Sequence, residues 1–157
     1  MGKLLDAAIK IAVDAHAEQY DRIGLPAIFH PMRIMMRIEI PENYSDLDID
    51  ILRATAILHD VLEDSDLSPD IIREILYKSS GYPYWTVNKV VSDVQMLTRT
   101  EDESYENYIN RVKESSDNAI NIKFADLFDN ISRKDIPMKK DSLKKRYENA
   151  LKILANK

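Results

Sequence analysis

The chain has 157 residues, of which 45% are hydrophobic and 31% charged, a composition typical of a soluble globular protein with one sizeable core. A net charge of −5 disfavours nucleic-acid binding, and the absence of cysteine excludes disulfides, zinc–cysteine sites and thiol nucleophiles. The sequence contains no P-loop or dinucleotide-binding motif and no apolar run long enough for a membrane span. We expect a single cytoplasmic domain over residues 1–157.

Apolar residues recur every three or four positions along most of the chain, which is the spacing of amphipathic helices. Gly24 and Pro26 interrupt the first such stretch, Pro31 suits a first helical turn, and Ser68–Pro69 suits a capped helix start. We therefore predict one all-α domain of seven or eight helices. They cover about residues 4–15, 30–38, 48–64, 69–78, 86–99, 104–115, 118–133 and 142–155.

The segment "LHDVLEDSD", residues 58–66, places several charges directly after an apolar run. Residues four apart share a face of a helix, which pairs His59 with Glu63 and Asp60 with Asp64. Buried charge is costly unless it is paired or binds a metal. Either the helix reaches the surface at His59, or these side chains hold a cation.

A second polar intrusion lies in "IKFADLFDN", where Asp126 and Asn130 are one turn apart among apolar residues. For Asp126 alone, a helix-end cap or a surface charge is an adequate explanation. The three histidines, however, all lie within the first 60 residues, at or near predicted helix ends. Several isolated residues of complementary ligand type favour a metal site.

Three motifs occur in order: "AHAEQ…GLPAIFHP", "ILHDVLED" and "IKFADLFDN". Together they resemble the HD superfamily of metal-dependent phosphohydrolases. More narrowly, they are similar to the hydrolase domain of the Rel/SpoT alarmone enzymes and their small single-domain relatives. The resemblance covers roughly residues 5–135 and implies a helical HD fold around one metal site.

The resemblance also implies roles for individual residues. Two imidazoles and two carboxylates would balance a divalent cation, and a ligand set without sulfur suits manganese. Such an ion would activate a water and polarise a phosphoryl oxygen. Sequence does not divide the catalytic roles of the two acids. The implied metal ligands are His30, His59, Asp60 and Asp126; the catalytic acids are Glu63 and Asp64; and Asn130 would help hold substrate. His16 is expected behind the ligands or in the core, with a ligand role as the alternative.

A polyanionic substrate needs more positive charge than one metal supplies, which makes Arg22, Lys123 and Arg99 candidate phosphate-binding residues; solvated surface cations are the alternative. Residues 97–99, "LTR", resemble a "VTK" segment near the pocket of the alarmone hydrolases. The base-recognition positions depart from that family, because Asp21, Ile23 and Ala27 stand where it has a basic residue, a serine and a tyrosine. An acid at position 21 offers no guanidinium plane and repels phosphate.

These features predict a metal-dependent phosphohydrolase acting on a nucleotide or related phosphoester. The best single hypothesis is removal of pyrophosphate from the 3′ position of a (p)ppGpp-like alarmone of the stringent response. The alternatives are a phosphomonoesterase acting on nucleoside monophosphates or another phosphorylated metabolite, and a non-catalytic nucleotide sensor. Alarmone synthesis is not expected in a chain of this length. No nucleic-acid or membrane partner is expected, and the oligomeric state and the role of the basic helix at 142–155 stay open.

Overall fold

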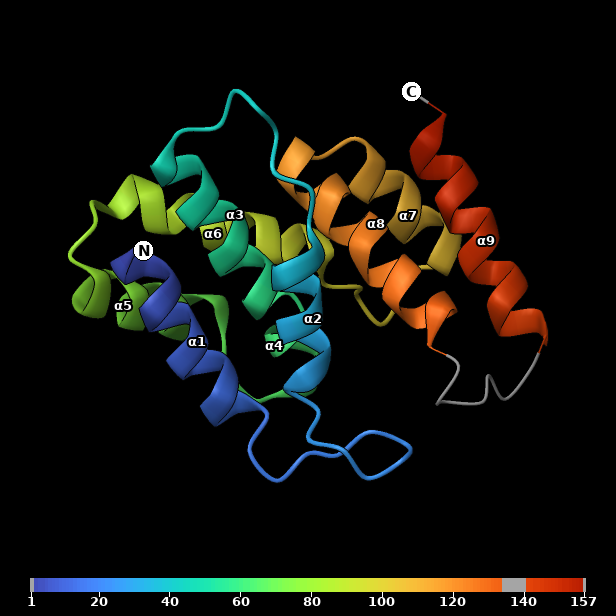
Figure 1. The fold of residues 1–157 in the computed structure, drawn as a ribbon, viewed down its shortest axis with the longest axis horizontal. Helices are drawn as coiled ribbons and strands as arrows, with labels where there is room; N and C mark the ends of the chain where they lie inside the picture. The colour runs from blue at the N-terminus through green and yellow to red at the C-terminus, as the bar shows by residue number, and fades with distance from the viewer. Residues whose placement is uncertain (1, 134–140, 157) are drawn as a thin grey trace.

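Every regular element in residues 2–133 and 141–156, which the computed structural model describes, is a helix (Figure 1). The predicted all-α class is therefore confirmed. Within these residues, none of the helices is both long and apolar enough to cross a membrane. The helices are α1 (Lys3–Ala15), α2 (Phe29–Arg37), α3 (Asp46–Leu58), α4 (Val61–Asp64), α5 (Pro69–Ser80), α6 (Tyr84–Leu97), α7 (Tyr105–Lys113), α8 (Asp117–Ser132) and α9 (Asp141–Ala155).

The continuous helix predicted over residues 48–64 is interrupted. It ends at Leu58, and the short α4 begins at Val61. His59 lies at the break, where its Nδ1 is 2.8 Å from the Ala56 carbonyl oxygen. A side chain that bonds the local backbone competes with helix continuation at that point. The described residues thus contain one helix more than the upper end of the prediction.

Serine side chains cap four of the helices. The hydroxyl of Ser68 accepts from the backbone N–H of residue 71 at the start of α5, as predicted, and Ser104 and Ser116 cap α7 and α8 in the same way. At α3, Ser45 and Asp48 form a reciprocal capping box. These local bonds satisfy N–H groups that lack a partner in the helix and define where each helix begins.

Helix α3 lies in the middle of the molecule and is shared by two hydrophobic clusters (Figure 1). Ile51 and Ile57 belong to the cluster with α1, α5 and α6, whereas Leu52 and Ala56 belong to the cluster with α2, α7, α8 and α9. A helix that is apolar on nearly all sides is typical of a buried position. Because both clusters hold α3, its C-terminal end at His59 has a well-defined place between α2 and α8, which also pack against it.

Candidate metal centre

Three potential ligands converge where the start of α2 meets the break between α3 and α4. His30, His59 and Asp60 each offer one ligand atom, and these atoms all lie within 4.8 Å of one another. Nε2 of His30 is 3.5 Å from Oδ2 of Asp60, and Nε2 of His59 is 3.1 Å from Oδ1 of Asp60. Three of the four predicted ligands therefore meet in space, and His30 comes from a separate helix, far in the sequence from the adjacent His59 and Asp60.

Asp126, on α8, adjoins this three-residue group without belonging to it. Its Oδ1 is 3.1 Å from Nε2 of His30 and accepts a hydrogen bond from Nδ2 of Asn130 at 2.7 Å. Its Oδ2 accepts from Nζ of Lys123, also at 2.7 Å. Burial alone would raise the pKa of Asp126, but Lys123 and the two histidines outweigh it and lower that pKa. The result is a buried, ionised carboxylate beside the candidate ligands.

The environment of His59 fits a bound cation. Since a carbonyl can only accept, Nδ1 of His59 donates to the Ala56 oxygen, which makes Nε2 the nitrogen whose lone pair is available to a metal. That Nε2 is buried and makes no regular hydrogen bond, although Oδ1 of Asp60 lies 3.1 Å away. A buried polar atom without a partner costs about 1–3 kcal/mol. Coordination of a divalent metal by imidazole nitrogen and carboxylate oxygen would use this lone pair.

The surrounding acids make the centre attractive to positive charge. Burial lowers the pKa of His30, but hydrogen bonds to Asp126 and Asp129 dominate and raise it to about 10. The pKa of the buried His59 is also raised, since Asp60 outweighs the opposing effect of burial. Both shifts have the same origin, carboxylates held close together away from solvent.

Asp129 is a residue that the sequence analysis missed. Its side chain is fully buried, and Oδ2 lies 2.9 Å from Nδ1 of His30, on the ring edge opposite Nε2. Arg33 and Arg37 also donate to this carboxylate. Two features of the sequence could have pointed to Asp129: it lies three residues after Asp126, and α2 carries two arginines one turn apart. Spacing alone does not reveal that these two helix faces meet.

The two predicted catalytic acids, Glu63 and Asp64, line the cleft beside the ligands and are exposed. Desolvation raises the pKa of both carboxyl groups, and the charge of Asp60 raises them further. Oε1 of Glu63 accepts from the backbone N–H of Arg99 at 2.6 Å. This bond ties α4 to the segment that precedes α7.

His16 lies outside the three-residue group. It is buried at the end of α1, where its Nδ1 is 2.9 Å from Oε1 of Gln19, and its Nε2 has no hydrogen-bond partner. Gln19 in turn donates to the backbone oxygen of Asp64 at 2.7 Å. His16 thus lies outside the ligand group, and Gln19 connects it to the backbone of Asp64.

A cleft of ≈ 680 Å³ adjoins these residues and is lined by all three predicted phosphate-binding side chains. Arg22 and Arg99 line it from exposed positions. Lys123 also lines it, but its side chain is only 11% exposed and its ammonium is paired with Asp126. The cleft therefore offers two exposed guanidinium groups, of which that of Arg99 also donates to the Glu103 carbonyl oxygen, and one buried cation that is already paired with Asp126.

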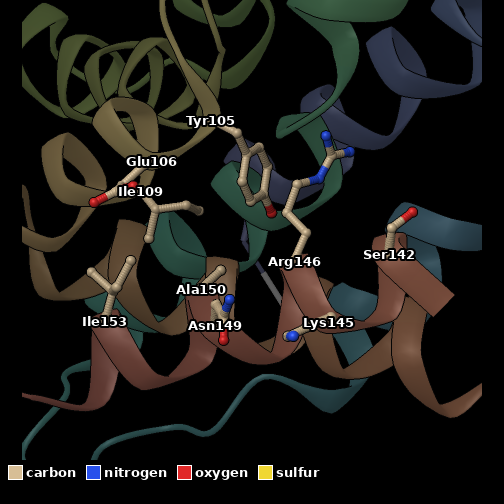
Figure 2. Close-up of a pocket in the computed structure, with 9 residues that line it drawn as sticks. All are labelled: Tyr105, Glu106, Ile109, Ser142, Lys145, Arg146, Asn149, Ala150 and Ile153. Atoms are coloured by element: carbon tan, nitrogen blue, oxygen red, sulfur yellow. The ribbon is translucent and has the colours of Figure 1, made fainter.

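The C-terminal helix α9 forms one wall of this cleft through Arg146 and Tyr147. An adjoining groove of ≈ 390 Å³ lies between α7 and α9. Figure 2 shows Tyr105 and Arg146 side by side among the residues that line it. The Arg146 guanidinium is 4.6 Å from the centre of the Tyr105 ring, and both residues also line the cleft. The role of α9, which the sequence left open, thus includes shaping the candidate site.

The carboxylate of Asp21 is hydrogen-bonded to its own loop and to Arg133. Its Oδ1 accepts from the backbone N–H groups of Ile23 and Leu25, and its Oδ2 accepts from Arg133 at 3.1 Å. Desolvation opposes ionisation, but these hydrogen bonds prevail and lower the pKa of Asp21. Asp21 lines the cleft, whereas Ile23 and Ala27 are not among the described residues that do. The acid at position 21 thus has internal partners for its charge.

No model of a known protein family matches the sequence. Among solved structures, the chain is similar to one described as a metazoan ortholog of SpoT that hydrolyses ppGpp and plays a role in starvation responses. The two share 18% sequence identity with a TM-score of 0.76, and the match covers 99% of this chain and 88% of the other. This likeness confirms the predicted HD-type helical fold.

Proposed function

We propose that this chain is a metal-dependent phosphohydrolase that acts on a nucleotide, with removal of pyrophosphate from the 3′ position of a (p)ppGpp-like alarmone as its activity. The proposal depends on one observation above all: His30, His59 and Asp60 bring three ligand atoms within 4.8 Å of one another at the base of a cleft. The activity described for the structural neighbour supports the choice of substrate.

The proposed metal ligands are His30, His59, Asp60 and Asp126, and the proposed ion is Mn²⁺. When bound, such an ion would lower the pKa of a water molecule and polarise a phosphoryl oxygen. Imidazole and carboxylate ligands without sulfur are compatible with manganese. The buried lone pair on Nε2 of His59 supports this assignment because it otherwise has no partner.

The remaining side chains supply proton transfer and charge. The pKa values of Glu63 and Asp64 are raised toward neutral pH. A carboxyl group transfers protons most effectively when its pKa is close to the working pH. We assign phosphate binding to Arg22 and Arg99, which reach the cleft from exposed positions. We also assign substrate binding to Asn130, which lines the cleft and donates a hydrogen bond to Oδ1 of Asp126.

A second candidate is a phosphomonoesterase acting on nucleoside monophosphates or a related phosphorylated metabolite. One observation favours it: the base-recognition positions differ from those of the alarmone hydrolases, and Asp21 is occupied with its own loop and Arg133. A site that does not select guanine could accept several nucleotides. The products distinguish the two activities, because the first releases pyrophosphate and the second orthophosphate.

The test is incubation of the purified protein with Mn²⁺ and a panel of nucleotides that includes ppGpp, followed by chromatography of the products. Asp60→Asn should lower turnover by at least about 100-fold, because it removes a metal ligand. Asp66→Asn, an exposed acid in the same segment, is the matched control and should leave turnover unchanged. A metal-loaded protein that cleaves no member of the panel would refute the hydrolase, and tight nucleotide binding without turnover would identify a sensor instead.

A further inference from the structure

Both histidines of the candidate centre direct Nε2 toward the carboxylate of Asp60, but different groups bind their Nδ1 atoms. Nδ1 of His59 donates to a carbonyl oxygen of its own helix, at 2.8 Å. Nδ1 of His30 instead lies 2.9 Å from the carboxylate of Asp129, 99 residues away in the chain. His59 is therefore oriented by local backbone, whereas the orientation of His30 depends on a long-range contact between α2 and α8.

The carboxylate of Asp129 accepts hydrogen bonds from two arginine side chains of α2. Arg33 donates through Nε to Oδ1 at 2.9 Å and through Nη2 to Oδ2 at 2.8 Å, in the two-pronged geometry typical of strong arginine–carboxylate pairs. Arg37 donates to Oδ1 at 3.0 Å. The side chain of Asp129 is 0% exposed, and the residue is not among the described ones that line the cleft. Asp129 is therefore not placed to contact substrate.

We propose that Asp129 is a positioning residue for metal binding: it holds the proton of His30 on Nδ1 and thereby directs the lone pair of Nε2 toward the metal. An ionised carboxylate only accepts hydrogen bonds, so Nδ1, which faces Asp129, must carry a proton. Nε2 faces Asp126 in the same way when no metal is present, and with a metal bound it would offer its lone pair to the ion instead. Arg33 and Arg37 keep the carboxylate ionised and fixed in place. Carboxylates that bind the far nitrogen of a ligating histidine generally set its tautomer and increase its strength as a ligand.

This inference rests on the proposed function, and it differs from a purely structural explanation of the cluster. If the ion pairs only joined α2 to α8, their loss would lower stability without changing how His30 binds an ion. A positioning role predicts a specific change in metal affinity and in the protonation of the His30 ring. These two quantities can be measured without any substrate.

The first experiment is calorimetric titration of the metal-free protein with Mn²⁺. Asp129→Asn should weaken binding by about 10- to 100-fold, the usual effect of removing a group that supports a metal ligand. Asp93→Asn is the matched control, because Asp93 is also a buried acid and accepts from Ser116 at the N-terminal end of α8, away from Asp129 near its C-terminal end. It should leave the affinity unchanged. Asp129→Glu, which keeps the charge, should recover part of the loss.

The second experiment is ¹⁵N NMR of the histidine rings in protein loaded with Zn²⁺, a diamagnetic probe. We expect His30 to carry its proton on Nδ1 and to bind zinc through Nε2, and Asp129→Asn to disturb this pattern. The wild-type spectrum alone decides the matter if the variant does not fold: zinc on Nδ1 of His30 would overturn the inference. Unchanged Mn²⁺ affinity in a folded Asp129→Asn protein would overturn it too, while leaving the proposed function intact. A wild-type protein that takes up neither metal would refute both.

Discussion

A Lys123 variant can test whether this side chain compensates the buried charge of Asp126 or binds substrate. Its ammonium lies 2.7 Å from Oδ2 of Asp126 and 5.0 Å from the centre of the Tyr108 ring. Burial lowers the pKa of Lys123, but the charge of Asp126 outweighs this and raises it, so the side chain is cationic. We predict that Lys123→Met destabilises the metal-free protein, because it leaves the buried Asp126 carboxylate with less compensating charge.

The magnitude follows from the burial of the pair. The side chains of Lys123 and Asp126 are only 11% and 8% exposed, and removal of one partner from a buried ion pair costs about 3–5 kcal/mol. His30 and Asn130 still contact Asp126, so we expect the lower end, about 3 kcal/mol. For a chain of this size that corresponds to a fall in Tm of roughly 6–12 °C. Adding Asp126→Asn should recover part of this loss, because the uncompensated charge disappears.

The assay is urea unfolding in the presence of EDTA, followed by circular dichroism. Lys10→Met removes an exposed lysine from α1 and serves as the control, with an expected change within about 0.5 kcal/mol. The role predicted from sequence, phosphate binding by Lys123, gives a different outcome. If Lys123→Met unfolds like the wild type and only raises KM, then Lys123 binds substrate and the ion-pair reasoning is wrong.

Three further predictions address metal, pH and helix capping. Mn²⁺ at 100 times its Kd should raise the free energy of unfolding by about 2.7 kcal/mol, an effect that EDTA reverses and Asp60→Asn abolishes in melting curves. Hydrogen bonds from Arg111 lower the pKa of Glu103 below its ordinary value of 4.5. This pair therefore stabilises the protein above that pH and loses its effect on acidification, so Glu103→Gln should flatten the acid limb of a stability–pH curve. Ser45→Ala should cost about 1 kcal/mol in urea unfolding, because the capping box with Asp48 is lost.

Each of these predictions has a clear contrary result. Stabilisation by Mn²⁺ that persists in Asp60→Asn would place the ion elsewhere. Parallel acid limbs for Glu103→Gln and the wild type would mean that Arg111 contributes no pH-dependent stability through this pair. A Ser45→Ala protein as stable as the wild type would show that water satisfies the N–H groups at the start of α3 equally well.

Much of the helical structure could be predicted because its causes are local. The spacing of apolar residues and the serine caps follow from neighbouring positions, as the start of α5 at Ser68–Pro69 illustrates. The interruption between α3 and α4 could not be predicted in this way. Leu58, Val61 and Leu62 keep the helical spacing of apolar residues across this point. Only the bond of His59 to Ala56 and the position of Asp60 beside His30 explain why the helix ends there.

The sequence by itself determined which chemical groups are available: three imidazoles and several carboxylates at helix ends or among apolar residues, and no cysteine thiol. Only the tertiary structure decided how these groups are used. It pairs Asp21 with Arg133 and Asp129 with His30, and it buries the pair of Lys123 and Asp126, which are neighbours on α8. Helical periodicity specifies which face of a helix is buried but not which residues it meets, since that depends on how separate helices pack. The partners of the candidate metal centre are therefore a property of the assembled fold.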